Sequence, residues 1–190
     1  MQGYKNVERV KLPLVDKNIK PAYITGILHL PKGTKKAPVV LWTGGVDKAL
    51  VEHHRSLIDT VNNGTAVLTF DMPGAGLNNN IILELGKETE AHDAALAFVK
   101  NDSRIDNTRI AALSQSGAGI PLMEFGMKTP ELKAIVFNKT KIDQQKEPGK
   151  ETSCCVKLLK PQQGGWFLGE RSPVCVCVIL RDMSAGPRAT

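Results

Sequence analysis

The stretch Arg109-Ile-Ala-Ala-Leu-Ser-Gln-Ser-Gly-Ala-Gly119 is a short apolar run that stops at a serine and continues in small residues. This pattern predicts a strand, a sharp turn and the start of a helix. A serine on such a turn projects its hydroxyl from the end of a parallel sheet, and the tight backbone requires small residues two positions to either side. Ser114 and Ala118 meet that requirement around Ser116, although the usual G-x-S-x-G pattern has glycine at both places. The alternative is that Ser116 caps the next helix.

Strands and helices alternate on both sides of this stretch. Two extended segments with polar turn residues between them predict an opening hairpin. After it, short apolar runs predict strands, and the segments between them, whose apolar residues have helical spacing, predict helices. The hairpin strands are expected at 7–15 and 22–30, later strands at 37–42, 65–70 and 132–137, and helices at 47–61, 83–100 and 117–127. This order predicts an α/β fold with a doubly wound, mostly parallel sheet and helices on both of its faces.

Two loops after predicted buried strands carry residues suited to a site. Thr43-Gly-Gly45 follows the strand over 37–42. Two glycines at such a place let the backbone approach a ligand and direct N–H groups toward it, where they can stabilise a developing oxyanion. Asp71 follows the strand over 65–70, also at the end of the sheet where site residues gather, but it opens a Pro-Gly turn and is explained as its cap.

Composition limits the classes of function. The formal net charge is +6, yet the lysines are scattered and form neither a basic helix nor an aromatic-basic stripe, so nucleic-acid binding is not expected. The N-terminus has charges where a signal peptide needs an apolar core, and no apolar run is long enough to cross a bilayer. We therefore expect a cytoplasmic protein without a membrane partner.

The four cysteines give no metal site. Cys154-Cys155 and Cys175-x-Cys177 lack the C-x2-C spacing of tetrahedral zinc, and no histidine lies near them. In the cytoplasm they are expected to be free thiols. The sequence predicts neither a metal nor another cofactor.

Several stretches, in order, resemble the FrsA-type (fermentation-respiration switch) esterases, a family of α/β-hydrolases. They are Leu41-Trp-Thr-Gly-Gly-Val-Asp47, Val67-Leu-Thr-Phe-Asp-Met-Pro-Gly-Ala-Gly76, Phe98-Val-Lys-Asn-Asp102, Ile105-Asp-Asn-Thr-Arg-Ile-Ala-Ala-Leu113 and Pro130-Glu-Leu-Lys-Ala-Ile-Val136. The resemblance implies a serine hydrolase acting on small-molecule carboxylic esters. It also implies that Ser116 is the nucleophile and that the N–H groups of Gly117, Gly44 and Gly45 form the oxyanion hole.

The resemblance covers residues 7 to about 137 and implies a hydrolase-like domain over 1–138. Residues 139–190 form an atypical tail that is expected to be partly disordered. Its apolar, β-branched run over 174–180 is typical of one more buried strand, parallel to the strand over 132–137, or is an incidental run. As a parallel strand it would bring Asp182 to the edge of the sheet on which Ser116 lies.

The residues also depart from the family. In this fold the acid and the histidine follow the serine, yet no histidine follows Ser116. His53 or His54 could approach the site from the helix over 47–61, although packing is the simpler role for them, as it is for His29 and His92. The abrupt tail favours a truncated, frameshifted or alternatively spliced chain over a new domain. Two hypotheses follow: an impaired serine esterase, or an inactive hydrolase scaffold with a binding or regulatory role, the latter including a disrupted-gene product.

Overall fold

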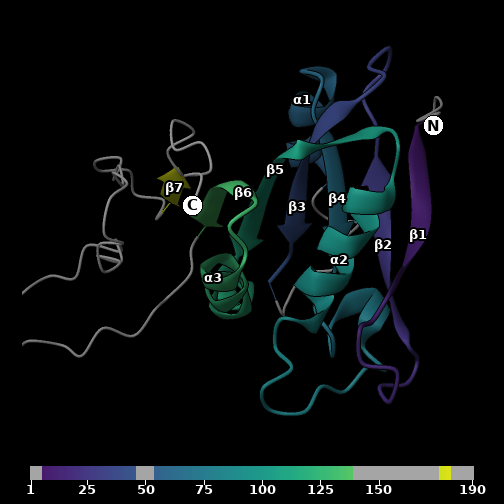
Figure 1. The fold of residues 1–190 in the computed structure, drawn as a ribbon, viewed down its shortest axis with the longest axis vertical. Coiled ribbons are helices and arrows are strands. Elements are labelled where there is room, and N and C mark those ends of the chain that lie inside the picture. Colours follow the sequence, from purple (N-terminus) through teal and green to yellow (C-terminus); the bar gives the residue numbers. More distant parts are fainter. Residues whose placement is uncertain (1–5, 46–53, 139–175, 181–190) are drawn as a thin grey trace, which may run out of the picture.

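The computed structural model describes residues 6–45, 54–138 and 176–180, which form one seven-stranded sheet with helices packed against it (Figure 1). The strands lie in the order β1-β2-β4-β3-β5-β6-β7. Their bounds are β1 Val7–Pro13, β2 Tyr23–His29, β3 Ala37–Thr43, β4 Ala66–Phe70, β5 Ile105–Gln115, β6 Leu132–Asn138 and β7 Val176–Leu180. The α-helices are α1 His54–Asn62, α2 Glu90–Asn101 and α3 Gly119–Lys128, and short 3-10 turns lie at η2 Gly76–Asn78 and η3 Ser116–Ala118.

The predicted hairpin and parallel sheet are both confirmed. β1 pairs with β2 in antiparallel register, and β2 in turn lies antiparallel to β4. The four strands β4, β3, β5 and β6 are parallel to one another. All five residues of β4 are buried, as expected of a strand covered on both faces.

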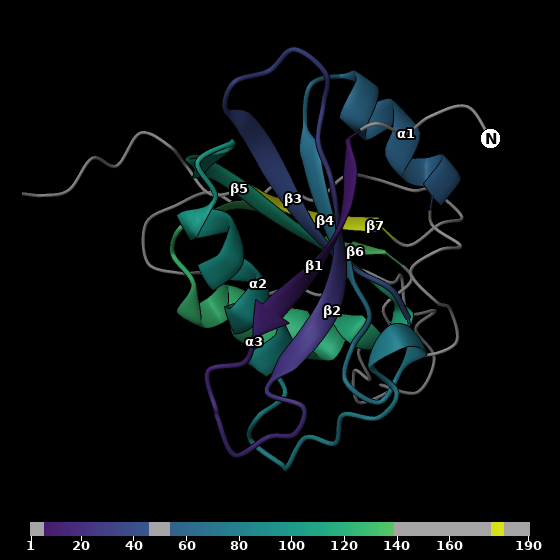
Figure 2. The same cartoon turned by 90° about the vertical axis from the view of Figure 1, so that its right-hand side faces the viewer.

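Helices cover both faces of the sheet, as predicted. The chain crosses from β3 to β4 in one direction through α1 and from β4 to β5 in the other direction through α2. Because parallel crossovers are right-handed, this reversal places α1 on one face and α2 on the other, an arrangement visible in Figure 2, where α3 lies beside α2. The largest fully buried side chains include Leu12, Ile24, Leu28, Leu41, Leu68, Phe70, Ile110, Leu122 and Phe125.

The helix predicted over 83–100 begins later, at Glu90. Its predicted first turns form a loop in which Gly86 has a φ of 84°, outside the helical region. The Glu90 carboxylate accepts the backbone N–H groups of Val15 (3.1 Å) and Asp16 (3.3 Å). These bonds join the hairpin loop to the start of α2. The spacing of apolar residues along the chain cannot predict such a long-range contact.

Other boundaries differ less. β5 begins at Ile105, four residues before the stretch that predicted it. The helix predicted over 117–127 is divided into η3 and α3. α1 confirms the later part of the helix predicted over 47–61, whose first residues lie outside the described ranges.

The strand predicted over 174–180 is present as β7, but its predicted direction is wrong. β7 runs antiparallel to β6, with Val176 opposite Asn138 and Leu180 opposite Ala134. Its carboxyl end therefore lies at the edge of the sheet where β6 begins, away from Ser116. This removes the reason for placing Asp182, itself outside the described residues, near the serine.

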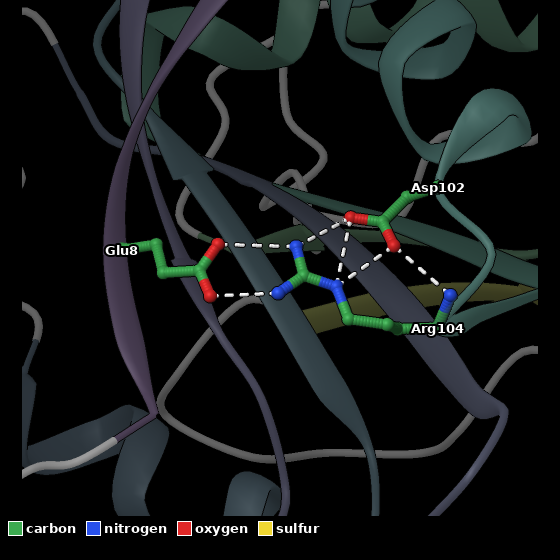
Figure 3. Close-up of polar contacts among 3 residues, drawn as sticks. All are labelled: Glu8, Asp102 and Arg104. Carbon is green, nitrogen blue, oxygen red and sulfur yellow. Dashed lines mark hydrogen bonds and ion pairs between the residues drawn. The ribbon is translucent and has the colours of Figure 1, made fainter.

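An ion-pair cluster connects the edge strand β1 to the start of β5 (Figure 3). The Arg104 guanidinium donates to both carboxylate oxygens of Glu8, at 2.6 and 3.0 Å. It also donates to Asp102 through Nε and Nη2, the shortest distance being 2.7 Å. These hydrogen bonds from Arg104 hold the pKa of Asp102 below its usual value. The cluster thus joins β1 to the residues that precede β5.

Candidate functional site

The carboxyl ends of the four parallel strands lie side by side at one edge of the sheet. Thr43, near the end of β3, pairs with Phe70 at the end of β4 and with Ser114 near the end of β5. Gln115 pairs with Asn138 at the end of β6. In open α/β sheets this is the edge at which ligands bind.

Ser116 occupies a sharp turn directly after β5. Its φ is 55°, and it is the only non-glycine residue with positive φ in the described ranges. That region is sparsely populated by L-residues with side chains and is a recognised form of backbone strain at functional sites. The residues two positions away, Ser114 and Ala118, are 0% and 1% exposed, and both are small, as such a turn requires. The predicted strand, turn and helix are therefore confirmed.

The alternative role of Ser116 as a helix cap is wrong. Ala118 occupies the N-cap position of α3 and Gln115 that of η3, and neither cap has a side-chain hydrogen bond. The Gly119 N–H instead donates to backbone carbonyl oxygens of Ser116 and Gly117. The Ser116 side chain, half-buried, is left at the sheet edge beside the exposed Gly117.

The predicted oxyanion donors lie at the same edge. Gly44 and Gly45 are buried residues directly after β3, the strand adjacent to β5. The Thr43 hydroxyl donates to the Leu113 carbonyl at 3.4 Å and so connects the ends of these two strands. The fold therefore brings both glycine segments and Ser116 to neighbouring strand ends, while their role in binding an oxyanion stays a prediction.

Asn78 was not singled out by the sequence, although it organises the loop after β4. Its side chain is 1% exposed and binds the N–H of Thr25 (2.8 Å), the carbonyl of Thr25 (3.2 Å) and the carbonyl of Asp71 (2.8 Å). The Asp71 carboxylate accepts the Leu77 N–H at 2.9 Å, which supports its predicted role in the turn. An asparagine within a polar Asn-Asn-Asn run gives no periodic signal, so only the contact reveals this role.

Two histidines, His29 and His92, are buried within the fold. His29 is opposite Val67 at the start of β4, which is the other edge of the sheet. His92 is buried in α2 between Phe70 and Phe125, and burial lowers its pKa to about 4. The ring contacts of His92 agree with the structural role that the sequence predicts for it.

The remaining histidines stay open as candidates. His54 begins α1, and His53 lies outside the described residues. Within the described ranges, no group of three or more His, Cys, Asp and Glu side chains could hold a metal ion. No helix of that part of the chain is long and apolar enough to span a membrane.

Exposed apolar side chains gather at the same edge of the sheet as Ser116. Of the seven large apolar side chains exposed in the described ranges, five lie on loops or helix starts at this edge. We call these five the apolar rim: Val15, Leu77, Ile82, Leu85 and Ile120. Val15 is in the hairpin loop, the next three follow β4, and Ile120 is in the first turn of α3.

Solved structures with this arrangement are α/β-hydrolases. The 2,6-dihydroxy-pseudo-oxynicotine hydrolase matches with a TM-score of 0.58 at 21% identity, over 66% of this chain and 34% of its own. A Pyrobaculum calidifontis esterase matches with a TM-score of 0.52 at 17% identity, over 68% of this chain and 43% of its own. The sheet, the helices on both faces and the turn at Ser116 thus define an α/β-hydrolase fold.

The sequence narrows this class to one family. Residues 6–143 match the FrsA-like esterases, and the chain belongs to that family. Esterase FrsA of Escherichia coli strain K12 / DH10B and that of Escherichia fergusonii are each 34% identical to it over 117 residues. The match covers 60% of this chain and only 28% of each relative, so the chain spans about a quarter of their length.

Proposed function

We propose that this chain supplies the nucleophile of a carboxylic-ester hydrolase and that Ser116 is this nucleophile. The observation that carries the proposal is the φ of 55° at Ser116, on a turn between β5 and α3. A strained serine at that place supports a nucleophile because the turn lifts Oγ clear of the sheet edge. Membership of an esterase family supports the same chemistry.

In the proposed reaction, Ser116 Oγ attacks the ester carbonyl carbon and the carbonyl oxygen takes on negative charge. The backbone N–H of Gly117, together with that of Gly44 or Gly45, donates to this oxygen. Fixed donors of this kind contribute most when they are oriented before the reaction, and a strand end holds them in place. The apolar rim offers contact area to the hydrocarbon part of an ester, which supports a small-molecule substrate with an apolar acyl or alkyl group.

The proposed reaction also needs a group that accepts the proton of the Ser116 hydroxyl. A serine hydroxyl without an adjacent base is a poor nucleophile, and no histidine follows Ser116. Loss of the triad in a serine protease costs about 10⁶ in turnover, and the remaining site retains only about 10³ to 10⁴ over water. We therefore expect very slow hydrolysis by this chain.

The second candidate is an inactive hydrolase scaffold with a binding or regulatory role. The missing downstream histidine favours it, together with the positions of His29 and His92. The cytoplasmic location, the lack of a nucleic-acid partner and the separate nature of residues 139–190 stay predictions under either candidate.

Hydrolysis of 4-nitrophenyl acetate and butyrate tests the proposal. The chain is compared with Ser116→Ala and with Ser114→Ala, a matched control two residues away. We expect slow release of nitrophenol that Ser116→Ala reduces to the background and Ser114→Ala retains. Reaction with a fluorophosphonate, followed by mass spectrometry of the labelled peptide, reports the nucleophile independently of turnover.

The outcomes separate the two candidates. Hydrolysis and labelling that are equal in the chain and in Ser116→Ala would refute the nucleophile and leave the inactive scaffold. Turnover at ordinary esterase rates that Ser116→Ala abolishes would refute the inactive scaffold. The base would then be sought with His54→Ala.

A further inference from the structure

His92 is a titratable side chain enclosed by apolar rings. It is 1% exposed in α2, with its ring centroid 5.4 Å from that of Phe70 in β4 and 5.2 Å from that of Phe125 in α3. The Phe125 ring is stacked on it, and the Phe70 ring meets it nearly at a right angle. Neither imidazole nitrogen has a hydrogen-bond partner among the described residues. The imidazole therefore joins three elements by packing alone.

Two charged groups act on His92, one from each helix. Asp93, its neighbour in α2, favours the protonated form, and Lys128 in α3 opposes it. The Asp93 carboxylate is already occupied by the Thr89 hydroxyl at 2.8 Å and by Lys128 Nζ at 2.8 Å. Phe70 and Phe125 carry no titratable group. Among these groups, none is therefore left as a dedicated counter-ion for a protonated His92.

A proton on His92 would place a charge among these rings without a partner. Burying an unpaired charge is costly, and this cost exceeds the attraction of an imidazolium for the face of the Phe125 ring. Water can hydrate the charged imidazole only if one of the three packed elements, α2, β4 or α3, moves away. α3 is the element joined directly to the serine turn, because η3 ends at Ala118 and α3 begins at Gly119.

We propose that His92 is an acid-sensitive latch: its protonation releases α3 from α2 and β4, and with α3 the turn that holds Ser116. The latch is closed while His92 is neutral and opens when the proton enters. It does not depend on ester hydrolysis, since the packing is the same whether or not Ser116 reacts.

The direction of the pH effect follows from the burial. Desolvation lowers the pKa of His92 from 6.5 to about 4, so the open state binds more protons than the closed state between these values. The stability of the closed latch therefore falls as the pH falls through this window. Relative to pH 7, opening becomes roughly twentyfold more favourable at pH 5 and on the order of a hundredfold more favourable at pH 4.

Amide hydrogen exchange of the full chain tests the latch directly. Protection of the peptide over 119–128 is measured at pH 7 and pH 5 and corrected for the intrinsic exchange rate at each pH, with the central strand over 37–43 as internal reference. We expect the 119–128 peptide to lose roughly twentyfold of its protection at pH 5 and the 37–43 peptide to lose much less. In His92→Phe the selective loss should be absent, whereas His54→Gln, a histidine change in α1 on the other face, should keep it.

A titration of the histidine Cε1–H resonances by NMR supplies a second readout on the unaltered chain. The resonance that disappears in His92→Phe, or in His92→Leu where the phenylalanine variant does not fold, should stay neutral down to about pH 5. Titration of that resonance near pH 6.5 would overturn the proposal. Equal protection of 119–128 at both pH values, or the same loss in His92→Phe, would overturn it as well.

Discussion

Replacing Asn78 with alanine should destabilise the fold far more than its place in a polar loop suggests. The β2–β4 ladder ends with Gly26 opposite Phe70, so the next pair would be Thr25 and Asp71. At this position the side-chain amide of Asn78 provides the hydrogen bonds. It accepts the Thr25 N–H and donates to the carbonyl oxygens of Thr25 and Asp71. A side-chain amide thus continues the ladder in place of a backbone peptide group.

The magnitude follows from the three bonds. All three join Asn78, itself 1% exposed, to backbone groups at the buried end of the sheet. At about 1 kcal/mol net for each bond, Asn78→Ala should lower the free energy of unfolding by about 3 kcal/mol. Asn78→Asp should cost at least as much, since a carboxylate cannot donate to the two carbonyl oxygens.

Urea unfolding followed by far-UV circular dichroism measures the effect. With an m-value of about 2 kcal/mol/M, the midpoint should fall by about 1.5 M without a change in m. Asn80→Ala is the matched control, because Asn80 is exposed in the same loop and should change the stability by less than about 0.5 kcal/mol. An Asn78→Ala midpoint within 0.2 M or so of the unaltered chain would refute the reasoning.

Two further substitutions test neighbouring parts of the structure. Gly76→Ala should cost about 2 kcal/mol or more in urea unfolding, because Gly76 has a φ of 47° and a Cβ there would collide with the Asp71 carboxylate; a loss below about 0.5 kcal/mol would contradict this. Arg104→Lys should cost about 1 kcal/mol, since an ammonium cannot bridge two carboxylates as the planar guanidinium does, and the loss should shrink in 1 M or so NaCl. Arg109→Lys, which alters a single exposed ion pair, should cost clearly less, and equal losses would argue against the bridging role.

The sequence identified the serine turn because local chemistry alone specifies it. A serine with positive φ directly after an apolar strand needs small residues two positions to either side. Ser114 and Ala118 are such residues. The hairpin and the parallel strands were also predictable, because extended segments around polar turn residues indicate a hairpin and burial of both faces of a strand leaves a continuous apolar run. The order of strands and helices then implied a doubly wound sheet.

Features that depend on distant partners were not predictable. The helix predicted over 83–100 starts only at Glu90, whose carboxylate binds the hairpin loop, and Leu85 in the segment before it is 97% exposed. An apolar strand carries no mark of its direction, since either orientation buries the same side chains. Only pairing with β6 decided that β7 runs antiparallel.

The sequence by itself therefore determined the type of fold, the family and the turn that presents Ser116, because each is encoded in neighbouring residues or in their order. Tertiary structure decided which elements meet: the amide of Asn78 against the end of β2, Arg104 across to β1, and His92 between two phenylalanine rings. The physical reason is that a polar or titratable side chain takes its role from its partners and its burial, and both are set by chain segments far away in sequence.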